Sequence, residues 1–386
     1  MWETNPLSAL CDVLDSRRKP ITKKDRSPGP YPYYGATGIL DYVEGYLFDE
    51  KLVLIGEDGA KWGAGDNSAF SIDGKTWVNN HAHVIRPKRN KVLDKWLIYY
   101  LNGEDLSDFI TGMTVPKLNQ GKLREIPIPL PPIPEQQRIV AILDQAFADI
   151  EKARANAEKN LKNARELFDS YLNQVFSQRG EGWVESELFD HVKFIDYRGK
   201  TPKKTQEGLR LITAKNVRMG YLKKTPEEFV AAESYDEWMT RGIPEKGDIL
   251  FTTEAPLANV AQLDTSEKVV FAQRIITMQP NRSVLDDAFL KYLLMSQPVQ
   301  ERILKKGTGA TVTGIKASLL KKIIIEYPFQ LSEQRRYVNT LDVLDRKVNQ
   351  LEVVFSKKLE SLDELKKSLL HQAFSGELTK TEGMVA

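Results

Sequence analysis

Two short basic segments stand out because their residue types suit contact with a polyanion. The first basic segment covers residues 15–26, and a similar second basic segment covers residues 196–204. Clustered lysine and arginine side chains on loops bounded by proline or glycine can neutralise nucleic-acid phosphates. The predicted phosphate contacts are Arg17, Lys19, Lys23, Lys24, Arg198, Lys200, Lys203 and Lys204. The alternative is that both segments are ordinary solvated loops.

Amide, aromatic and basic side chains elsewhere in the chain could pair with base edges. Asparagine and glutamine can bond bidentately to adenine, and arginine to guanine. The candidates in the first half of the chain are Tyr33, Tyr34, Asn79, Asn80 and His81. Those in the second half are Asn216, Arg218, Gln273 and Arg274. Satisfied polar loop residues are the alternative for each, but their occurrence in both halves favours a shared function.

Two related loops, residues 111–119 and 308–316, combine small residues with one lysine each. Small residues permit close approach of a backbone, so Lys117 and Lys316 are candidate phosphate clamps. Lys61 is a third candidate and lies in the glycine-rich segment 59–65. This segment matches neither the P-loop nor the dinucleotide-binding pattern, which favours a turn. Plain loops before a strand are the alternative for the other two.

No catalytic pattern accompanies these groups. The Pro-Pro pair at residues 131–132 lacks the flanking residues with which an amino-methyltransferase grips a flipped adenine. His81 and His83 alternate as strand residues do and could hold a metal, but no third ligand is evident. Glu57 and Asp58 are more typical of a turn than of a nuclease site. The sequence therefore predicts a chain that is not an enzyme and that holds no metal or cofactor.

The composition is that of a folded protein with balanced charge. The chain has 386 residues, 41% hydrophobic and 28% charged, with a formal net charge of +2. Any nucleic-acid surface must therefore be local. A membrane-spanning apolar run, a signal peptide and a disulfide partner for Cys11 are all missing from the sequence. We expect a cytoplasmic protein without membrane contact.

An internal repeat organises the chain. The sequence EQQR at residues 135–138 recurs as EQRR at residues 333–336, an offset of 198. Over residues 135–177 the ungapped alignment gives 15 identities in 43 positions, too many for shared helical composition alone. Weaker matches extend upstream with small shifts, as insertions in loops would produce. The order is variable block, helix, variable block, helix.

Both matched segments carry apolar residues at steps of three and four, which is the seam of a coiled coil. The blocks before them contain short apolar runs that predict buried strands at residues 51–55, 82–85, 248–252 and 274–278, and helices at residues 94–101 and 287–294. We predict an α+β fold in which two mixed, strand-rich domains are joined by two long antiparallel coiled-coil helices with internal pseudo-twofold symmetry. The predicted boundaries are 1–133, 134–180, 181–330, 331–378 and a tail, 379–386.

At this point the sequence resembles a known family, the DNA-specificity subunits of type I restriction-modification systems. The resemblance covers nearly the whole chain and rests on the alternating blocks and on three family-like runs. These runs are residues 34–38, 127–140 and 370–378. The second copy departs from the pattern at residues 327–331, where the double proline is missing.

The resemblance implies a subunit without catalytic activity. Each strand-rich domain would be a target-recognition domain that reads one half of a split target in double-stranded DNA. The helices would set the spacing and dock two methyltransferase (modification) subunits, which bind S-adenosylmethionine, and a restriction subunit that uses ATP can join. The target sequence does not follow from the residues. Two alternatives stay open: a coiled-coil adaptor with two protein-binding heads, and a stand-alone adenine methyltransferase or nuclease.

Overall fold

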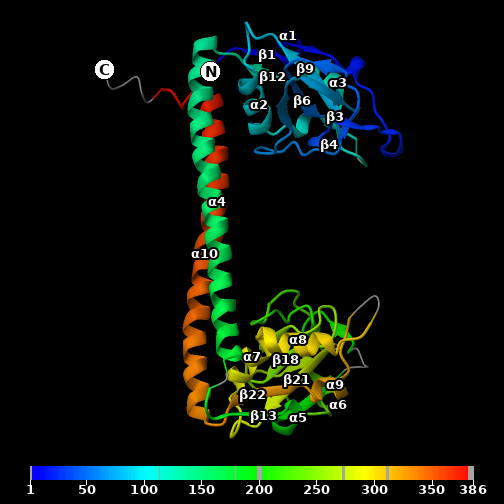
Figure 1. Cartoon of the computed structure of the whole chain (residues 1–386). Coiled ribbons are helices and arrows are strands. Elements are labelled where there is room, and N and C mark those ends of the chain that lie inside the picture. The colour runs from blue at the N-terminus through cyan, green and yellow to red at the C-terminus, as the bar shows by residue number, and fades with distance from the viewer. Residues whose placement is uncertain are drawn as a thin grey trace. The chain divides into compact units, whose positions relative to one another are not determined.

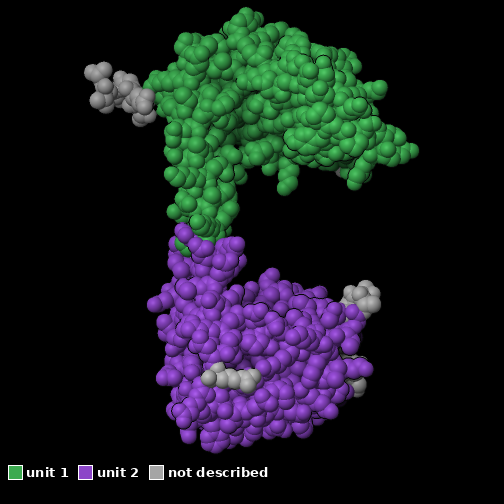
Figure 2. Space-filling model, in the orientation of Figure 1, with its two compact units in different colours: residues 1–159, 355–386 green, residues 160–354 purple. Residues whose placement is uncertain are grey.

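The computed structural model describes residues 2–112, 114–178, 180–197, 202–271, 274–309 and 313–380. The chain divides into two compact units (Figure 2), of which the first comprises residues 1–159 and 355–386 and the second residues 160–354. Each unit contains one strand-rich domain and parts of both long helices. Within the described ranges, no helix is long and apolar enough to cross a membrane.

The long helices α4 (Ile133–Ser177) and α10 (Leu331–Ser375) each have 45 residues (Figure 1). In the first unit, Glu135 near the start of α4 accepts a hydrogen bond from Thr379, just beyond the end of α10. About five helical turns further along α4, Arg154 pairs with Asp363. Partner numbers fall as the numbers in α4 rise, so the helices are antiparallel, as predicted.

The strand-rich domain of the first unit contains two four-stranded sheets. Its first sheet has the order β2-β9-β6-β7. These strands are β2 (Cys11–Val13), β9 (Ala82–Pro87), β6 (Leu52–Gly56) and β7 (Ala69–Ile72). Its second sheet has the order β4-β3-β8-β5, with β3 and β8 parallel. These strands are β4 (Gly38–Val43), β3 (Pro28–Gly35), β8 (Lys75–Val78) and β5 (Phe48–Asp49).

The domain of the second unit repeats the topology of the first sheet, and its second sheet also has four strands but carries its parallel pair at the edge. Its first sheet, β14-β21-β18-β19, corresponds strand for strand to that of the first unit. These strands are β14 (Val192–Asp196), β21 (Ile275–Pro280), β18 (Ile249–Thr252) and β19 (Val260–Gln262). Its second sheet, β15-β17-β16-β20, again contains one parallel pair, β16 with β20. These strands are β15 (Lys204–Thr205), β17 (Phe229–Val230), β16 (Leu209–Ile212) and β20 (Val269–Phe271).

A two-stranded ladder closes each domain just before its long helix. In the first unit β1 (Thr4–Pro6) pairs with β12 (Pro127–Pro129), and in the second β13 (Trp183–Glu187) pairs with β22 (Ile324–Pro328). A further pair, β10 (Ile110–Thr111) and β11 (Lys117–Leu118), belongs to the first unit. The shorter α-helices are α1 (Leu7–Leu10), α2 (Asp94–Gly103), α3 (Gln120–Glu125), α5 (Leu188–His191), α6 (Tyr235–Trp238), α7 (Asp287–Met295), α8 (Gln297–Lys305) and α9 (Ala317–Lys321).

The strands predicted from apolar runs are β6, β9, β18 and β21, and the predicted short helices are α2 and α7. All four strands are almost entirely buried, because both faces of each first sheet are covered. The α+β class with two strand-rich domains and long antiparallel helices is therefore confirmed.

Both long helices contribute to the core of each unit, which explains the apolar seam. In the first unit, Leu143 of α4 and Ala373 of α10 are fully buried in one cluster with Trp96 of α2. In the second unit, Leu341 of α10 and Leu172 of α4 occupy the corresponding cluster. Each domain buries its apolar face against the paired helices. The domain and the helix segments beside it therefore share one hydrophobic core and depend on each other for stability.

Candidate nucleic-acid interface

Three loops of the first unit meet at one backbone position. The main-chain N–H of Glu57, directly after β6, donates to the carbonyl of His81 over 2.8 Å. The carbonyl of Glu57 accepts from the N–H of Leu118, also over 2.8 Å. Asp58 forms an isolated bridge with Lys117. We call this arrangement of residues 57–58, 81 and 117–118 the first loop frame.

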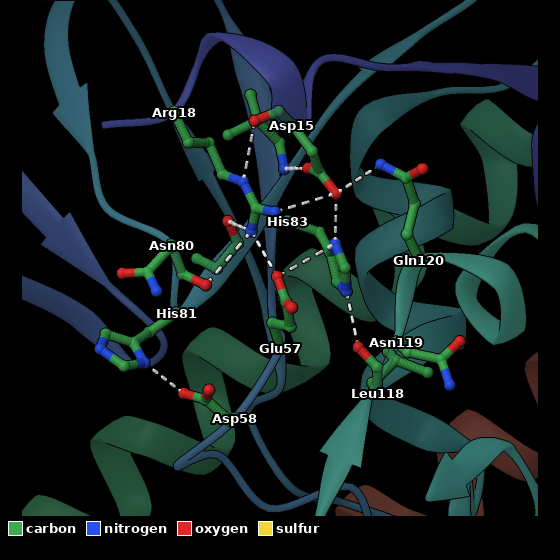
Figure 3. A network of polar contacts seen from close by, with 12 residues as sticks. Asp15, Arg18, Glu57, Asp58, Asn80, His81, His83, Leu118, Asn119 and Gln120 are labelled. Atoms are coloured by element: carbon green, nitrogen blue, oxygen red, sulfur yellow. Dashed lines mark hydrogen bonds and ion pairs between the residues drawn. The ribbon is translucent and has the colours of Figure 1, made fainter. Parts of the chain in front are cut away.

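A buried polar network lies beneath the frame (Figure 3). The imidazole of His83 is completely buried, with Nδ1 2.6 Å from Asp15 Oδ2 and Nε2 2.7 Å from the carbonyl oxygen of Leu118. The other carboxylate oxygen of Asp15 accepts the N–H of Val84 over 2.9 Å, and Gln120 Nε2 donates to Oδ2 over 2.9 Å. The network therefore ties three separate segments to one strand.

Two cations neutralise the acidic groups of this network. Arg18 Nη1 lies 2.5 Å from Glu57 Oε2, and Arg18 Nη2 lies 3.3 Å from Asp15. Lys117 Nζ lies 2.7 Å from Glu57 Oε1. Burial acts to raise the pKa of Asp15, but its hydrogen bond from His83 and the other contacts lower the pKa overall. The pKa of Glu57 is also lowered, because bonds from Lys117 and Arg18 outweigh its burial.

The carboxylates supply the extra ligands that the spacing of His81 and His83 did not reveal. Ligand atoms of Asp15, Glu57 and His83 all lie within 4.8 Å of one another. However, Arg18 and Lys117 already contact the same carboxylates, and both ring nitrogens of His83 face acceptors. A metal ion would have to displace these cations at a cost in charge repulsion. The donor set thus fits a structural network that fixes the loops better than it fits a metal site.

The polar groups that face solvent at the frame are few. His81 is 51% exposed in its side chain, and its Nδ1 pairs with the carboxylate of Asp58 (Figure 3). Asn80, the residue before His81, is exposed, and so is Lys61. Asn79 is buried instead, where its Oδ1 accepts the N–H of His81 over 2.8 Å and shapes the turn.

The first basic segment presents Lys19, Lys23 and Lys24 to solvent, and these form no ion pair with any described residue. The other predicted contact of the segment, Arg17, holds it in place. Arg17 lies over the ring of Phe48 at 4.5 Å and donates to the carbonyl of Leu47.

Tyr33 is buried behind the first basic segment, where its hydroxyl accepts the N–H of Ile21 over 2.9 Å. Tyr34 is half-buried and packs at 6.0 Å from Phe70, and burial raises the pKa of its hydroxyl. Lys117 pairs with Glu57, as described above. The structure therefore gives these three residues positioning contacts inside the domain.

The second unit repeats the loop frame with different side chains. The N–H of Thr253 donates to the carbonyl of Arg274 over 2.9 Å, and its carbonyl accepts from Ile315 over 3.0 Å. Glu254 bridges Gly314 as Asp58 bridges Lys117. We call residues 253–254, 274 and 314–315 the second loop frame. Hence Arg274 corresponds to His81, and Glu254 to Asp58.

Arg274 is the exposed cation of the second frame. Its Nε lies 3.0 Å from Glu254 Oε1, and the Arg274 side chain is 52% exposed. The backbone of Arg274 has a positive φ of 74°, which residues other than glycine rarely adopt. Strained backbone of this kind is found where a side chain must be held in one place.

The remaining predicted residues of the second unit fall into four groups. Lys203 and Lys316 are exposed, and Lys204 is exposed but pairs with Glu228 at 2.7 Å. Arg218 is half-buried in a turn. Asn216 is buried, and its side chain forms its hydrogen bonds within its own loop. Its Oδ1 accepts from Thr213, and its Nδ2 donates to two main-chain carbonyls. Arg198, Lys200 and Gln273 lie outside the described residues.

Sequence reasoning missed the acidic members of this surface. Asp58 and Glu254 each follow the end of a buried strand by two residues, and that shared position was the available signal. Each frame presents a half-exposed nitrogen-bearing side chain, His81 or Arg274, beside a carboxylate, and in the first frame Lys117 Nζ also lies 3.9 Å from Asp58 Oδ2. Such donor and acceptor groups can bond to the edges of bases.

Comparisons with known proteins agree with this picture. A family model described as "Type I restriction modification DNA specificity domain" matches residues 1–159 and 181–361. A type I restriction enzyme specificity subunit of Haemophilus influenzae is 28% identical over 90% of this chain and 89% of its own length. The MjaVIII specificity subunit of Methanocaldococcus jannaschii is 23% identical over 98% of this chain and 93% of its own.

Solved structures share the fold. A chain from a study of assembly and conformational transition of the type I R-M system aligns with a TM-score of 0.73 at 20% identity, covering 98% of both chains. The HsdS subunit of Thermoanaerobacter tengcongensis aligns with a TM-score of 0.55 at 20% identity, covering 98% of this chain and 97% of that one.

Proposed function

Since this chain belongs to the family of type I restriction-modification DNA specificity proteins, we propose that its two strand-rich domains each bind one half of a bipartite target in double-stranded DNA. The chain is the specificity subunit of such a system and is not itself an enzyme. The observation that carries the proposal is the duplicated loop frame, in which the same main-chain hydrogen bonds hold different exposed side chains.

Different parts of each domain serve different purposes in this proposal. The exposed lysines of the basic segments contact phosphates and supply affinity that does not depend on sequence. The side chains of the loop frames contact bases and supply the sequence preference. The buried groups Tyr33, Asn79 and Asn216 fix loop shape and act on the DNA only through their neighbours.

The long helices set the distance between the half-sites and dock the partner subunits in this proposal. Two methyltransferase subunits, and a restriction subunit where one is present, would bind this chain. The support is a set of exposed apolar side chains, one on α4 and five on α10, of which the neighbours Val353 and Val354 together offer apolar area to a protein partner. They are Leu167, Val343, Leu351, Val353, Val354 and Leu365.

The test is to produce the chain together with a methyltransferase subunit of the same system and to map methylated adenines in the host DNA. We expect one motif made of two short specific parts separated by a gap of fixed length. A single continuous motif would contradict the division between two domains. Copurification of the two subunits without any sequence preference would favour the coiled-coil adaptor instead.

A further inference from the structure

His81 and Arg274 are equivalent residues of the two loop frames, and each is paired with an acidic side chain. The acidic partners, Asp58 and Glu254, are also equivalent, because each is the second residue after the central strand of its sheet. We propose that each of these two pairs contacts one base of its half-site and selects it, an inference that rests on the proposed function. We call them the base-reading pairs. The pair Arg274 and Glu254 selects guanine, and the pair His81 and Asp58 selects a base with an exocyclic amino group.

Stability alone does not explain the pairs. Their side chains are half-exposed, and exposed ion pairs contribute little to folding. The residues beneath them differ completely between the units: Glu57 belongs to a buried charged network, whereas its equivalent Thr253 is buried without one. At this site the main-chain frame and the exposed pair are common to both units, whereas the side chains beneath them differ. A contact with a molecule outside the chain explains this better than a contribution to folding.

The geometry of Arg274 suits guanine. Glu254 engages the guanidinium through Nε, and no other described side chain pairs with Arg274. The terminal nitrogens thus remain to donate to O6 and N7 of guanine, the commonest specific contact in the major groove. The carboxylate restrains the long side chain before binding, which reduces the ordering cost on the DNA.

The geometry of His81 suits a different base. The carboxylate of Asp58 lies next to Nδ1 of His81, and in the tautomer whose Nδ1–H donates a hydrogen bond to this carboxylate, Nε2 is an acceptor. No described residue bonds to Nε2. In the major groove the donors available to such an acceptor are N6 of adenine and N4 of cytosine. At this equivalent position the second unit therefore offers the DNA a hydrogen-bond donor, Arg274, and the first unit an acceptor, His81 Nε2.

The experiment is selection from a random double-stranded DNA library by the full-length chain assembled with its methyltransferase subunit. Wild type defines the bipartite motif. Arg274→Ala should lower the preference for guanine at one position of one half-site by about tenfold or more and leave the other half-site unchanged. His81→Ala should do the same in the opposite half-site, at an adenine or a cytosine.

A more specific test places the residues of the second pair at the equivalent positions of the first frame. The double change His81→Arg with Asp58→Glu copies the second pair into the first frame, and we expect guanine to replace the original base at that one position. Lys204→Ala, an exposed lysine paired with Glu228, is the matched control and should weaken binding to all sequences alike. The conservative changes Arg274→Lys and His81→Gln cover the case in which an alanine variant does not fold, and Arg274→Lys should also lose the preference for guanine.

Two outcomes separate the inference from the function on which it rests. If wild type selects no bipartite motif, the proposed function fails. If wild type selects such a motif but folded variants at Arg274 and His81 select the same one, the proposed function stands and the base-reading pairs are refuted. Loss of preference at several positions of both half-sites would also refute them.

Discussion

Gln136 and Gln334 occupy the same position in the two copies of the repeat, and their buried carboxamides make the same set of hydrogen bonds. Gln136 Oε1 accepts the N–H of Leu93 over 2.9 Å, and its Nε2 donates to the carbonyls of Lys91 and Pro131 over 2.9 Å each. One side chain thus joins the start of α4 to the segment that leads into α2. This explains why a polar residue recurs at a buried point of the motif EQQR.

The second copy repeats this joint. Gln334 accepts the N–H of Asp286 over 2.8 Å and donates to the carbonyls of Val284 and Pro328 over 2.9 and 2.8 Å. The double proline is missing before α10, as noted in the sequence, yet Pro328 supplies the same carbonyl that Pro131 supplies in the first copy. The departure from the family pattern therefore leaves the joint intact.

We predict that Gln136→Ala lowers the free energy of unfolding of the first unit by about 2 to 4 kcal/mol, because a buried N–H and two carbonyls lose their partner. The neighbouring residue Gln137 is exposed, so Gln137→Ala is a matched control and should change stability by less than about 0.5 kcal/mol. Urea unfolding followed by circular dichroism measures both. Equal effects of the two variants would show that the joint carries no special stability.

The network beneath the first loop frame predicts a dependence of stability on pH. The pKa values of Asp15 and Glu57 are lowered in the folded chain, so their ionised forms bind protons less readily there than in the unfolded chain. The stability that they add is fully present above their ordinary values, near pH 4 to 5. It is lost as the pH falls through the lowered values of the folded state.

The variant Asp15→Asn isolates this contribution. At pH 7 we expect it to be less stable than wild type by about 1 to 3 kcal/mol, because hydrogen bonds to a charged acceptor are replaced by weaker ones. The difference should shrink as the pH is lowered below about 4, where wild type also loses the charge. Urea unfolding at a series of pH values tests this, and a constant difference from pH 3 to 7 would contradict it.

The exposed lysines of the first basic segment should contribute affinity without sequence preference. If both Lys23 and Lys24 touch phosphates, changing them together to alanine should reduce the slope of log affinity against log salt concentration by about two. Lys152→Ala with Lys159→Ala, on the exposed side of α4, is the control and should leave the slope unchanged. Binding titrations across salt concentrations measure it, and an altered base preference at an unchanged slope would reverse our assignment. Lys203 with Lys204 is the equivalent test in the second unit.

The long helices should control the gap in the target. Inserting seven residues into both helices, between Arg154 and Arg165 in α4 and between Glu352 and Asp363 in α10, preserves the apolar seam and both ion pairs. Seven residues add about 10 Å of helix, close to three base pairs of axial rise. We expect methylation mapping to show the same half-sites with a gap longer by about three base pairs. A changed half-site with an unchanged gap would refute the separation of spacing from recognition.

The sequence by itself determined the architecture, because the information was local or repeated. Spacing of apolar residues along residues 135–177 and 333–375 specifies a helix with one buried stripe, and self-similarity at a fixed offset shows that the chain contains the same unit twice. The buried strands β6 and β18 follow from short apolar runs. The resemblance to the DNA-specificity family was visible for the same reason, since the runs that carry it, residues 34–38, 127–140 and 370–378, are short and contiguous.

The tertiary structure alone decided which polar residues are free to contact DNA. His81 and His83 are two residues apart, yet His83 is buried against Asp15, 68 positions away, while His81 faces solvent. Asn216 looked like a base reader, but its own loop uses its whole side chain. A bond between distant segments decides the position of His83, whereas bonds within one folded loop decide that of Asn216. In both cases the polar residue type gives no sign of whether its partner will be protein or solvent. The equivalence of His81 with Arg274 likewise emerges only from the loop frames, because variable loops align through their main-chain bonds and not through their side chains.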